Sequence, residues 1–297
     1  MKTFFERSFY AVFSSYGRLL CCLLAGDKFI SQRLECSAKE FSFLVSAATA
    51  LFLALLLPFL GWEFAFSWRS VIILVVLIAC KIGEFYTSAS LLKTVSAYEL
   101  KAWLSINVIV SYLVDLGRGM ESFFWSFIPC AAVLLLGVGM IAFSHQQEGT
   151  DKKSKGIVYL LLSLGYIAST FLYGLAINEL GLTSEASRIS TLLLVMVGVA
   201  LLQLPFVRFR TFFKKKGLVL GALTRLLNAA GLWTEAIAAQ QNLLLYSLVQ
   251  PMQLFILFIT ALIKKEPLTK TKLIGTIAAL AAVTVMTILI YINRGTI

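Results

Sequence analysis

The sequence lacks the parts from which most enzyme active sites are built. It has a single histidine, His145, and only 14% of its 297 residues are charged. The five cysteines show neither the paired spacing of metal ligands nor the even number of a disulfide set. No glycine-rich phosphate loop is present, and no histidine accompanies a candidate nucleophile. We therefore expect no enzymatic activity, no metal site and no cofactor.

Long polar stretches are equally scarce, and this excludes a soluble protein. Hydrophobic residues make up 59% of the chain, and the mean hydropathy is +0.88. A soluble domain cannot bury that much apolar surface, so the composition predicts a polytopic membrane protein. The net charge of +11 lies in short gaps between apolar runs, without aromatic interleaving. Topology and anionic lipid headgroups explain it better than nucleic acid does. We expect the lipid bilayer as a partner and the bacterial inner membrane as the location.

The apolar residues fall into ten segments. They lie near 8–26, 38–60, 68–92, 98–116, 122–144, 157–180, 185–207, 217–239, 243–264 and 270–292. One polar linker, at 149–156, separates a first unit, 1–148, from a second unit, 157–297. Each segment is close to the roughly 20 residues that a helix needs to cross a bilayer. The linker therefore divides five expected spans from five.

A shift of 148 residues aligns the two halves without a gap. The informative matches pair small residues and a tyrosine: Gly17 with Gly165, Ser42 with Ser190, Gly83 with Gly231, and Tyr98 with Tyr246. Because each half has an odd number of spans, the second half enters the membrane from the opposite side. The predicted fold is an all-α polytopic membrane protein with ten transmembrane helices in two inverted five-helix repeats.

The stretch Leu243–Met286 contains two apolar runs joined by a charged turn. Pro251 lies inside the first run, Glu266-Pro267-Leu268-Thr269 lies in the turn, and Gly275 lies in the second run. This pattern resembles the signature of the drug/metabolite transporter superfamily, in particular its EamA-like branch. The resemblance implies ten helices that move a small solute, with helices three and eight lining the central cavity. Trp103 replaces the proline in the first half, so we expect helix four to be straighter than helix nine.

Charge and resemblance disagree about membrane orientation. With ten spans, six basic residues of the loops and termini lie on the side of the termini and seventeen on the opposite side. The positive-inside rule then places the termini outside the cytoplasm and the loops at 214–216 and 264–272 inside it. The family resemblance implies the reverse orientation. Both interpretations depend on segment 8–26 crossing the membrane.

Ionisable residues at membrane depth are the main candidates for a substrate site. Helix three carries Lys81, Glu84 and Ser88 on one face, and helix eight carries Arg225, Asn228 and Glu235 on one face. An ionised group at the bilayer centre costs roughly 2.5–3.5 kcal/mol, so it is expected to face protein or water. The structural alternative is that Lys81 and Glu84 neutralise each other and Arg225 reaches toward the headgroups.

Three further residues complete the predicted substrate-binding set. Trp103 and Tyr246 could stack on a solute, although aromatic residues more often serve packing or the membrane interface. Gln250 precedes Pro251, which frees a backbone carbonyl one turn earlier. Contacts between helices are the alternative role for such amides.

These features favour a secondary transporter that works by alternating access. Its expected cargo is a small polar metabolite, anionic or zwitterionic, such as an amino acid or another carboxylate. No nucleotide-binding domain is present, so we expect an ion gradient or solute exchange to drive transport, with Glu84 and Glu235 as candidate carriers of a coupled proton. A lipid-linked sugar flippase and a non-transporting membrane scaffold remain alternatives.

Overall fold

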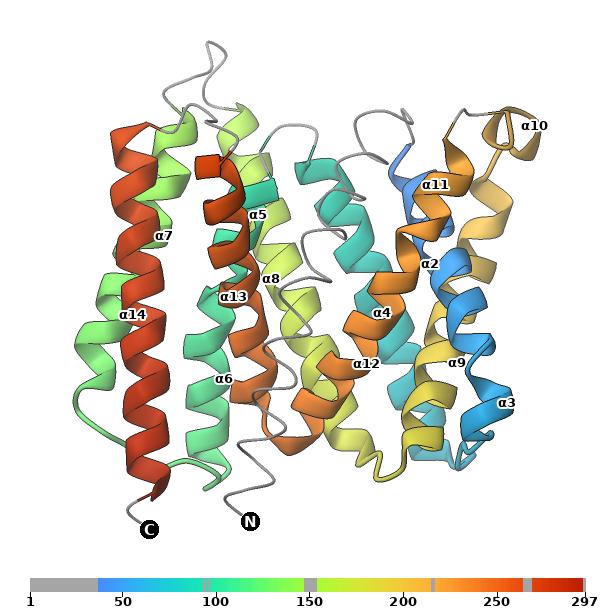
Figure 1. The fold of residues 1–297 in the computed structure, drawn as a ribbon, viewed down its shortest axis with the longest axis horizontal. Coiled ribbons are helices and arrows are strands. Elements are labelled where there is room, and N and C mark those ends of the chain that lie inside the picture. The colour runs from blue at the N-terminus through green and yellow to red at the C-terminus, as the bar shows by residue number, and fades with distance from the viewer. Residues whose placement is uncertain are drawn as a thin grey trace.

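The computed structural model describes residues 37–92, 95, 97–146, 154–214, 217–263 and 269–295. All regular structure within these residues is helical, as the sequence predicts, and the helices stand side by side in one bundle (Figure 1). The expected first span, 8–26, lies outside the described residues, as do 149–153 of the linker and 264–268 of the turn. Position 154 already belongs to a helix, so the linker is shorter than expected at its end.

Six helical segments of the described chain are long and apolar enough to cross a membrane. They are Ala38–Leu60, Trp68–Leu91, Glu99–Gly117, Ile157–Leu180, Glu185–Phe206 and Lys270–Ile290. A shorter apolar helix covers Phe127–Ala142. This is the architecture expected of an integral α-helical membrane protein.

The first half contains six helical elements within the described residues. They are α2 (Ala38–Ala54), α3 (Leu57–Leu60), α4 (Trp68–Leu91), α5 (Ala97–Leu104), α6 (Ile106–Gly117) and α7 (Phe127–Gln146). Local sequence sets where these helices begin: Ser37 and Glu40 form a capping box at α2, and the Ser67 side chain accepts a bond from the Ser70 amide at α4.

The second half contains eight helical elements within the described residues. They are α8 (Ser154–Leu180), α9 (Glu185–Gln203), the 3₁₀ turn η1 (Leu204–Phe206), α10 (Phe209–Phe212), α11 (Leu218–Leu223), α12 (Arg225–Gln241), α13 (Leu243–Ile263) and α14 (Lys270–Gly295). Ser184 caps α9, and the Thr269 hydroxyl accepts a bond from the Lys272 amide at the start of α14. That bond caps the first turn of α14.

The prediction that helix four is straighter than helix nine is wrong. Helix four is divided at Ser105 into α5 and α6. At this division the Ser105 and Val108 amides each donate to the carbonyl oxygen three residues earlier, and not four residues earlier as in a regular α-helix. α13, by contrast, continues through Pro251. Proline removes one amide donor, but a bilayer helix tolerates that loss when neighbouring groups satisfy the freed carbonyl. The segment expected at 217–239 is also divided, at Thr224.

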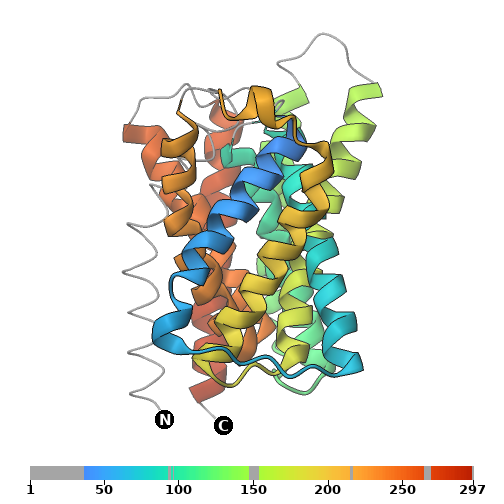
Figure 2. The same ribbon diagram turned by 90° about the vertical axis from the view of Figure 1, so that its right-hand side faces the viewer.

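Helices from the two halves pack against each other throughout the bundle. α2 lies against α9, α4 against α8, and α7 against α14, and α13 contacts α5, α6 and α12. Figure 2 shows α2 (blue) crossing α9 (yellow). The closest approach joins α7 and α14, where a Cβ on Gly137 would lie 2.6 Å from the Gly275 carbonyl oxygen. Glycine at both positions lets the two backbones touch.

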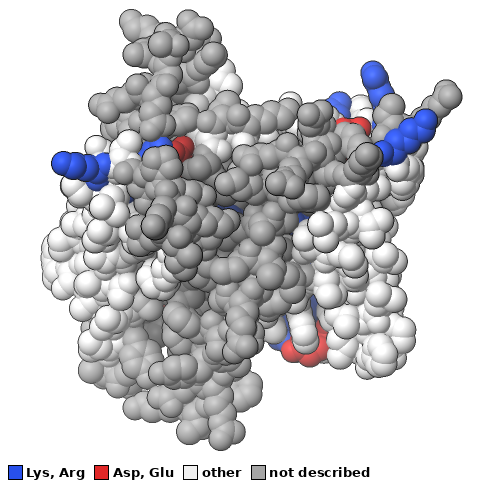
Figure 3. Space-filling view, turned by 45° about the horizontal axis from the view of Figure 1, so that its top comes forward, with Lys and Arg blue, Asp and Glu red and all other residues white. Residues whose placement is uncertain are grey.

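Two apolar cores flank the centre of the bundle. One joins α2, α4, α8, α9 and α12, and the other joins α6, α7, α13 and α14. In Figure 3, lysine and arginine side chains (blue) stand out at the upper rim, while the flanks are mainly white. The polar residues considered next lie mainly on α4, α5, α8 and α12.

Candidate functional site

Lys81 lies near the middle of α4 and is almost fully buried, with 2% of its surface exposed. Its Nζ lies 2.7 Å from Glu84 Oε2, so the ion pair that their spacing allows is formed. The same Nζ lies 4.0 Å from the centroid of the Tyr173 ring on α8. A desolvated ammonium on an aromatic face gains roughly 2 kcal/mol. The cation is thus held between a carboxylate and a ring.

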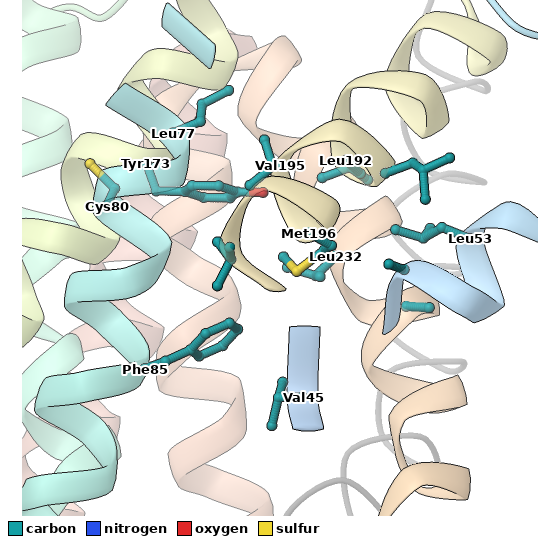
Figure 4. Packing of buried hydrophobic residues seen from close by; sticks show 14 of the residues in the cluster. Val45, Leu53, Leu77, Cys80, Phe85, Tyr173, Leu192, Val195, Met196 and Leu232 are labelled. Carbon is teal, nitrogen blue, oxygen red and sulfur yellow. The ribbon is translucent and has the colours of Figure 1, made fainter. Parts of the chain in front are cut away.

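Tyr173 fills the space between α4 and α9. Figure 4 shows its ring near Leu77 and Cys80 of α4, with the hydroxyl directed toward Val195 of α9. The side chain is fully buried, and its hydroxyl has no hydrogen-bond partner among the described residues. A buried hydroxyl without a hydrogen-bond partner destabilises the folded state, and this one lies beside a buried cation.

Two further charges join Lys81 and Glu84 from other helices. Glu235 of α12 interacts electrostatically with Lys81, Glu84 and Lys101. Lys101 of α5 is directed at α8, where its Nζ lies 3.3 Å from the Tyr166 hydroxyl. We call Lys81, Glu84, Lys101 and Glu235 the charged cluster. It contains two cations and two carboxylates, and four helices (α4, α5, α8 and α12) position it.

Arg225 and Asn228 lie in a different part of α12. Arg225 has 1% of its surface exposed, and its Nε and Nη2 lie 3.3 and 3.1 Å from the Thr224 hydroxyl. Asn228 donates to the Thr49 hydroxyl of α2 at 3.0 Å. Ten residues separate Arg225 from Glu235, which is about 15 Å along a helix. Of the predicted face on helix eight, only Glu235 therefore lies at the level of the charged cluster.

Ser88 and Trp103 are both engaged by neighbouring groups. The Ser88 hydroxyl donates to the Phe85 carbonyl oxygen within α4 at 3.1 Å. The Trp103 indole donates to the Tyr159 hydroxyl of α8 at 2.6 Å, and their rings meet edge to face. Trp103 thus joins α5 to α8 in this conformation.

Tyr246 joins α13 to α8. Its hydroxyl donates to the Thr170 carbonyl oxygen at 3.0 Å. Its ring lies so close to Gly174 that a Cβ there would be 2.3 Å from a ring carbon. The side chain of Gln250, the remaining predicted site residue, lies outside the described set. Tyr246 thus holds α8 against α13, and Trp103 holds α8 against α5.

Lys101 is the member of the charged cluster that the sequence interpretation missed. Its position three residues inside the expected segment 98–116 places it in a helix and not in a loop, and this was the signal that the sequence offered.

Ion pairs join the helix ends at the lower end of the bundle in Figure 1. Glu179 of α8 pairs with Arg69 of α4 at 3.1 Å and with Arg118, which follows α6, at 2.5 Å. Arg118 also donates to the Asn178 side chain at 2.9 Å. These bonds connect the first half of the chain to the second. The described residues include no group of three or more His, Cys, Asp or Glu that could hold a metal ion.

Comparisons with known proteins identify a shared fold. No family model matches the sequence, and neither does any curated protein. Matching chains of known structure number 24. One of them, described only as "Crystal structure of protein", has a TM-score of 0.60 and 15% sequence identity, and the alignment covers 93% of this chain and 99% of that one. At this identity, the likeness shows the fold alone.

The charged cluster is chemically suited to hold a small group that carries both signs of charge. Lys81 and Lys101 can each bind a carboxylate, and Glu84 and Glu235 can each bind an ammonium group. All four lie within the bundle, where water is scarce and electrostatic interactions are stronger than at the surface.

Proposed function

We propose that this protein is a secondary transporter for a small solute that carries a carboxylate, either an anion or a zwitterion such as an amino acid. The observation that carries the proposal is the position of Lys81, a buried lysine in the middle of an apolar helix that is paired with Glu84 and stacked on Tyr173. Charge at membrane depth is costly and is retained mainly where it serves a function.

Partner exchange at Lys81 explains how binding could occur. In the present conformation, Glu84 and the Tyr173 ring neutralise and shield the ammonium group. A solute carboxylate would compete with Glu84 for Lys81, and the released Glu84 would then pair with a solute ammonium group or take up a proton. The balance of two cations and two carboxylates favours a zwitterion over a solute with a single charge.

We further propose that the chain forms ten transmembrane helices in two inverted repeats, as in the EamA-like transporters that its sequence resembles. The packing supports this arrangement, because α4 of the first half contacts α9 of the second, and α12 of the second half contacts α2 of the first. Under the 148-residue shift, these two contacts are equivalent. The bacterial inner membrane is the proposed location.

Alternating access would then require the ion pairs at the lower end to open. Glu179 holds two arginines of the first half, so the lower end is closed in this conformation. Rocking of one half against the other would break these pairs and expose the charged cluster from that side. Exposed ion pairs suit such a gate because each contributes only about 0–1 kcal/mol.

The decisive experiment measures binding and uptake by purified protein. Thermal shift against a panel of amino acids and small carboxylates should identify a ligand, since a ligand at 100 times its Kd adds about 2.7 kcal/mol of stability. Uptake of that compound into proteoliposomes should then require Lys81. Lys39→Met is the matched control, because Lys39 is an exposed lysine that stacks on Phe206. Unchanged uptake in both Lys81→Met and Arg225→Met, at equal amounts of folded protein, would show that the site assignment is wrong.

The inverted arrangement has its own test. Single cysteines are placed at Thr150 and Arg294 in a chain whose native cysteines have been replaced, and they are labelled with an impermeant reagent. Thr150 follows five proposed spans and Arg294 follows ten, so the two cysteines should react from opposite faces. Reaction of both from the same face would rule out the ten-span topology.

A further inference from the structure

A second polar site lies on α6, apart from the charged cluster. Asn107 has 1% of its surface exposed and Ser111 has none, and both are enclosed in the bundle. Neither the Asn107 Nδ2 and Oδ1 atoms nor the Ser111 hydroxyl has a hydrogen-bond partner among the described residues. Buried amides and hydroxyls are almost always hydrogen-bonded. Three unpaired polar atoms on consecutive turns of one helix therefore call for an explanation.

The two side chains face α13. Asn107, Ser111 and Asp115 follow each other at intervals of four residues, so they share one face of α6. Asp115 Oδ2 accepts a bond from the Leu244 amide at the start of α13, at 2.9 Å. The neighbouring face of α6, with Val108 and Tyr112, packs into the apolar core with α7, α13 and α14. The bond of Asp115 to Leu244 places the polar face on the side of α6 that meets α13, which lies beside α6 (Figure 1).

α13 offers a further acceptor at the same level. The two segments run antiparallel, from the bond between Asp115 and Leu244 at one end to the packing of Ala102 against Leu254 at the other. This register places Asn107 and Ser111 beside the turn of α13 that contains Ser247 and Pro251. Pro251 has no N–H to donate to the Ser247 carbonyl oxygen. We call Asn107, Ser111 and this carbonyl the neutral patch.

The neutral patch lies at the depth of the charged cluster. Contacts of Lys101 with Tyr166 and of Arg118 with Asn178 fix α5 and α6 alongside α8. Asn107 and Ser111 lie between Lys101 and Arg118, and Tyr173, which holds Lys81, lies between the corresponding residues of α8. The neutral patch and the charged cluster thus lie at one level of the bundle.

We propose that the neutral patch binds an uncharged hydrogen-bonding group of the solute, a hydroxyl or a carboxamide, while the charged cluster binds its charged end. This inference rests on the proposed transport function and narrows its substrate class. The Asn107 amide offers both a donor and an acceptor, and Ser111 adds a hydroxyl. A metal cation would satisfy only the oxygen atoms and would leave the Asn107 Nδ2 donor unpaired, so the chemistry favours a hydroxyl or carboxamide.

Pairs of compounds that differ only in the hydrogen-bonding group test this directly. The probes are L-threonine with L-valine, L-asparagine with L-leucine, and L-malate with succinate, and their dissociation constants are measured by calorimetry. The wild-type protein should bind the polar member of at least one pair at least about tenfold more tightly, as expected for one good hydrogen bond. Asn107→Leu and Ser111→Ala should reduce that preference and leave the affinity for the apolar member unchanged.

The variants are chosen so that folding does not obscure the result. Asn107 and Ser111 have no side-chain hydrogen bonds to lose within the described part of the chain, so the melting temperature of either variant should not fall. Ser42→Ala is the matched control, because the Ser42 hydroxyl on α2 is also buried and unpaired. That variant should keep the full preference for the polar compound.

Each outcome separates this inference from the transport proposal. An undiminished preference in Asn107→Leu overturns the inference, and loss of binding in Lys81→Met at the same time leaves the transport proposal standing. If Asn107→Leu changes the dependence of uptake on sodium instead of the preference within a pair, the patch is an ion site and the inference is wrong. If the wild-type protein binds no compound of the panel, both proposals fail.

Discussion

Lys81 and Arg225 are both buried cations on apolar helices, yet their surroundings differ. Lys81 lies against a carboxylate and an aromatic ring, and Glu235 on a third helix interacts with it electrostatically. Arg225 lies at the start of α12, where the Thr224 hydroxyl accepts bonds from its guanidinium group. One cation is surrounded by groups that can exchange partners, and the other is held beside a helix break.

This comparison shows why burial alone does not identify a solute contact. Arg225 is as well buried as Lys81, with 1% against 2% of its surface exposed. Carboxylates of Glu84 and Glu235 interact with Lys81, whereas the Thr224 hydroxyl accepts bonds from Arg225 at the division between α11 and α12. We therefore expect Lys81 to act in binding and Arg225 to act mainly in holding helix eight together.

The largest expected effect belongs to Lys81→Met. Removing the ammonium group leaves Glu84 and Glu235 with Lys101 alone as a counter-charge, and the solute carboxylate loses its main partner. We expect uptake to fall by at least about 100-fold, equivalent to roughly 2.7 kcal/mol of binding free energy. Uptake is measured in proteoliposomes with equal amounts of folded protein, and Lys39→Met should retain the wild-type rate. A loss below threefold would contradict the role of Lys81.

The next effect concerns Arg225→Met, which should lower stability clearly and uptake only moderately. The variant loses the bonds to Thr224, so unfolding should become easier by about 1–3 kcal/mol. Uptake per folded molecule should fall by less than about tenfold, equivalent to 1.4 kcal/mol. Melting curves in detergent and uptake assays separate the two quantities. If Arg225→Met matched Lys81→Met in uptake without losing stability, the two cations would have equivalent roles.

The sequence predicted the elements that depend on local pattern. The ion pair of Lys81 with Glu84 follows from a spacing of three residues on a helix, and the structure forms it. The proximity of Glu235 and Lys101 to that pair depends on how α5 and α12 pack around α8. The spacing of residues along the sequence does not encode that packing. The sequence also placed Arg225 and Glu235 on one functional face, although ten residues of helix put them at different depths.

The helix breaks show the same limit. Pro251 is the strongest local breaker in the second half, yet α13 continues through it, whereas Ser105 divides helix four without any proline. Contacts of Trp103 and Lys101 with α8 hold α5 in place on one side of that division. The polar face of Asn107, Ser111 and Asp115 was visible in the sequence as a four-residue repeat within an apolar segment, and it was missed because no ionised group at its centre drew attention to it.

A smaller effect should follow from Thr49→Val, which tests the neighbourhood of Arg225. The hydroxyl of Thr49 accepts a bond from Asn228, and valine keeps the shape of the side chain. We expect a loss of about 1 kcal/mol in stability, because one buried hydrogen bond is removed and the Asn228 amide loses a partner. Solute affinity should stay within twofold of wild type by calorimetry. A larger change in affinity would mean that Asn228 contacts the solute after all.

An equally small effect on stability is expected for Glu179→Gln at the lower end. Its carboxylate pairs with Arg69 and Arg118 and is 41% exposed, so water and salt screen both interactions. Exposed ion pairs typically contribute 0.2–1 kcal/mol, and we expect a loss of about 1 kcal/mol in total. The loss should shrink when the salt concentration is raised to about 1 M, where the Debye length is about 3 Å. The effect of Lys81→Met on solute affinity should persist at that salt concentration, because a buried pair is screened much less. If Glu179→Gln abolished uptake at every salt concentration, the lower end would take part in binding the solute and would not simply close the bundle.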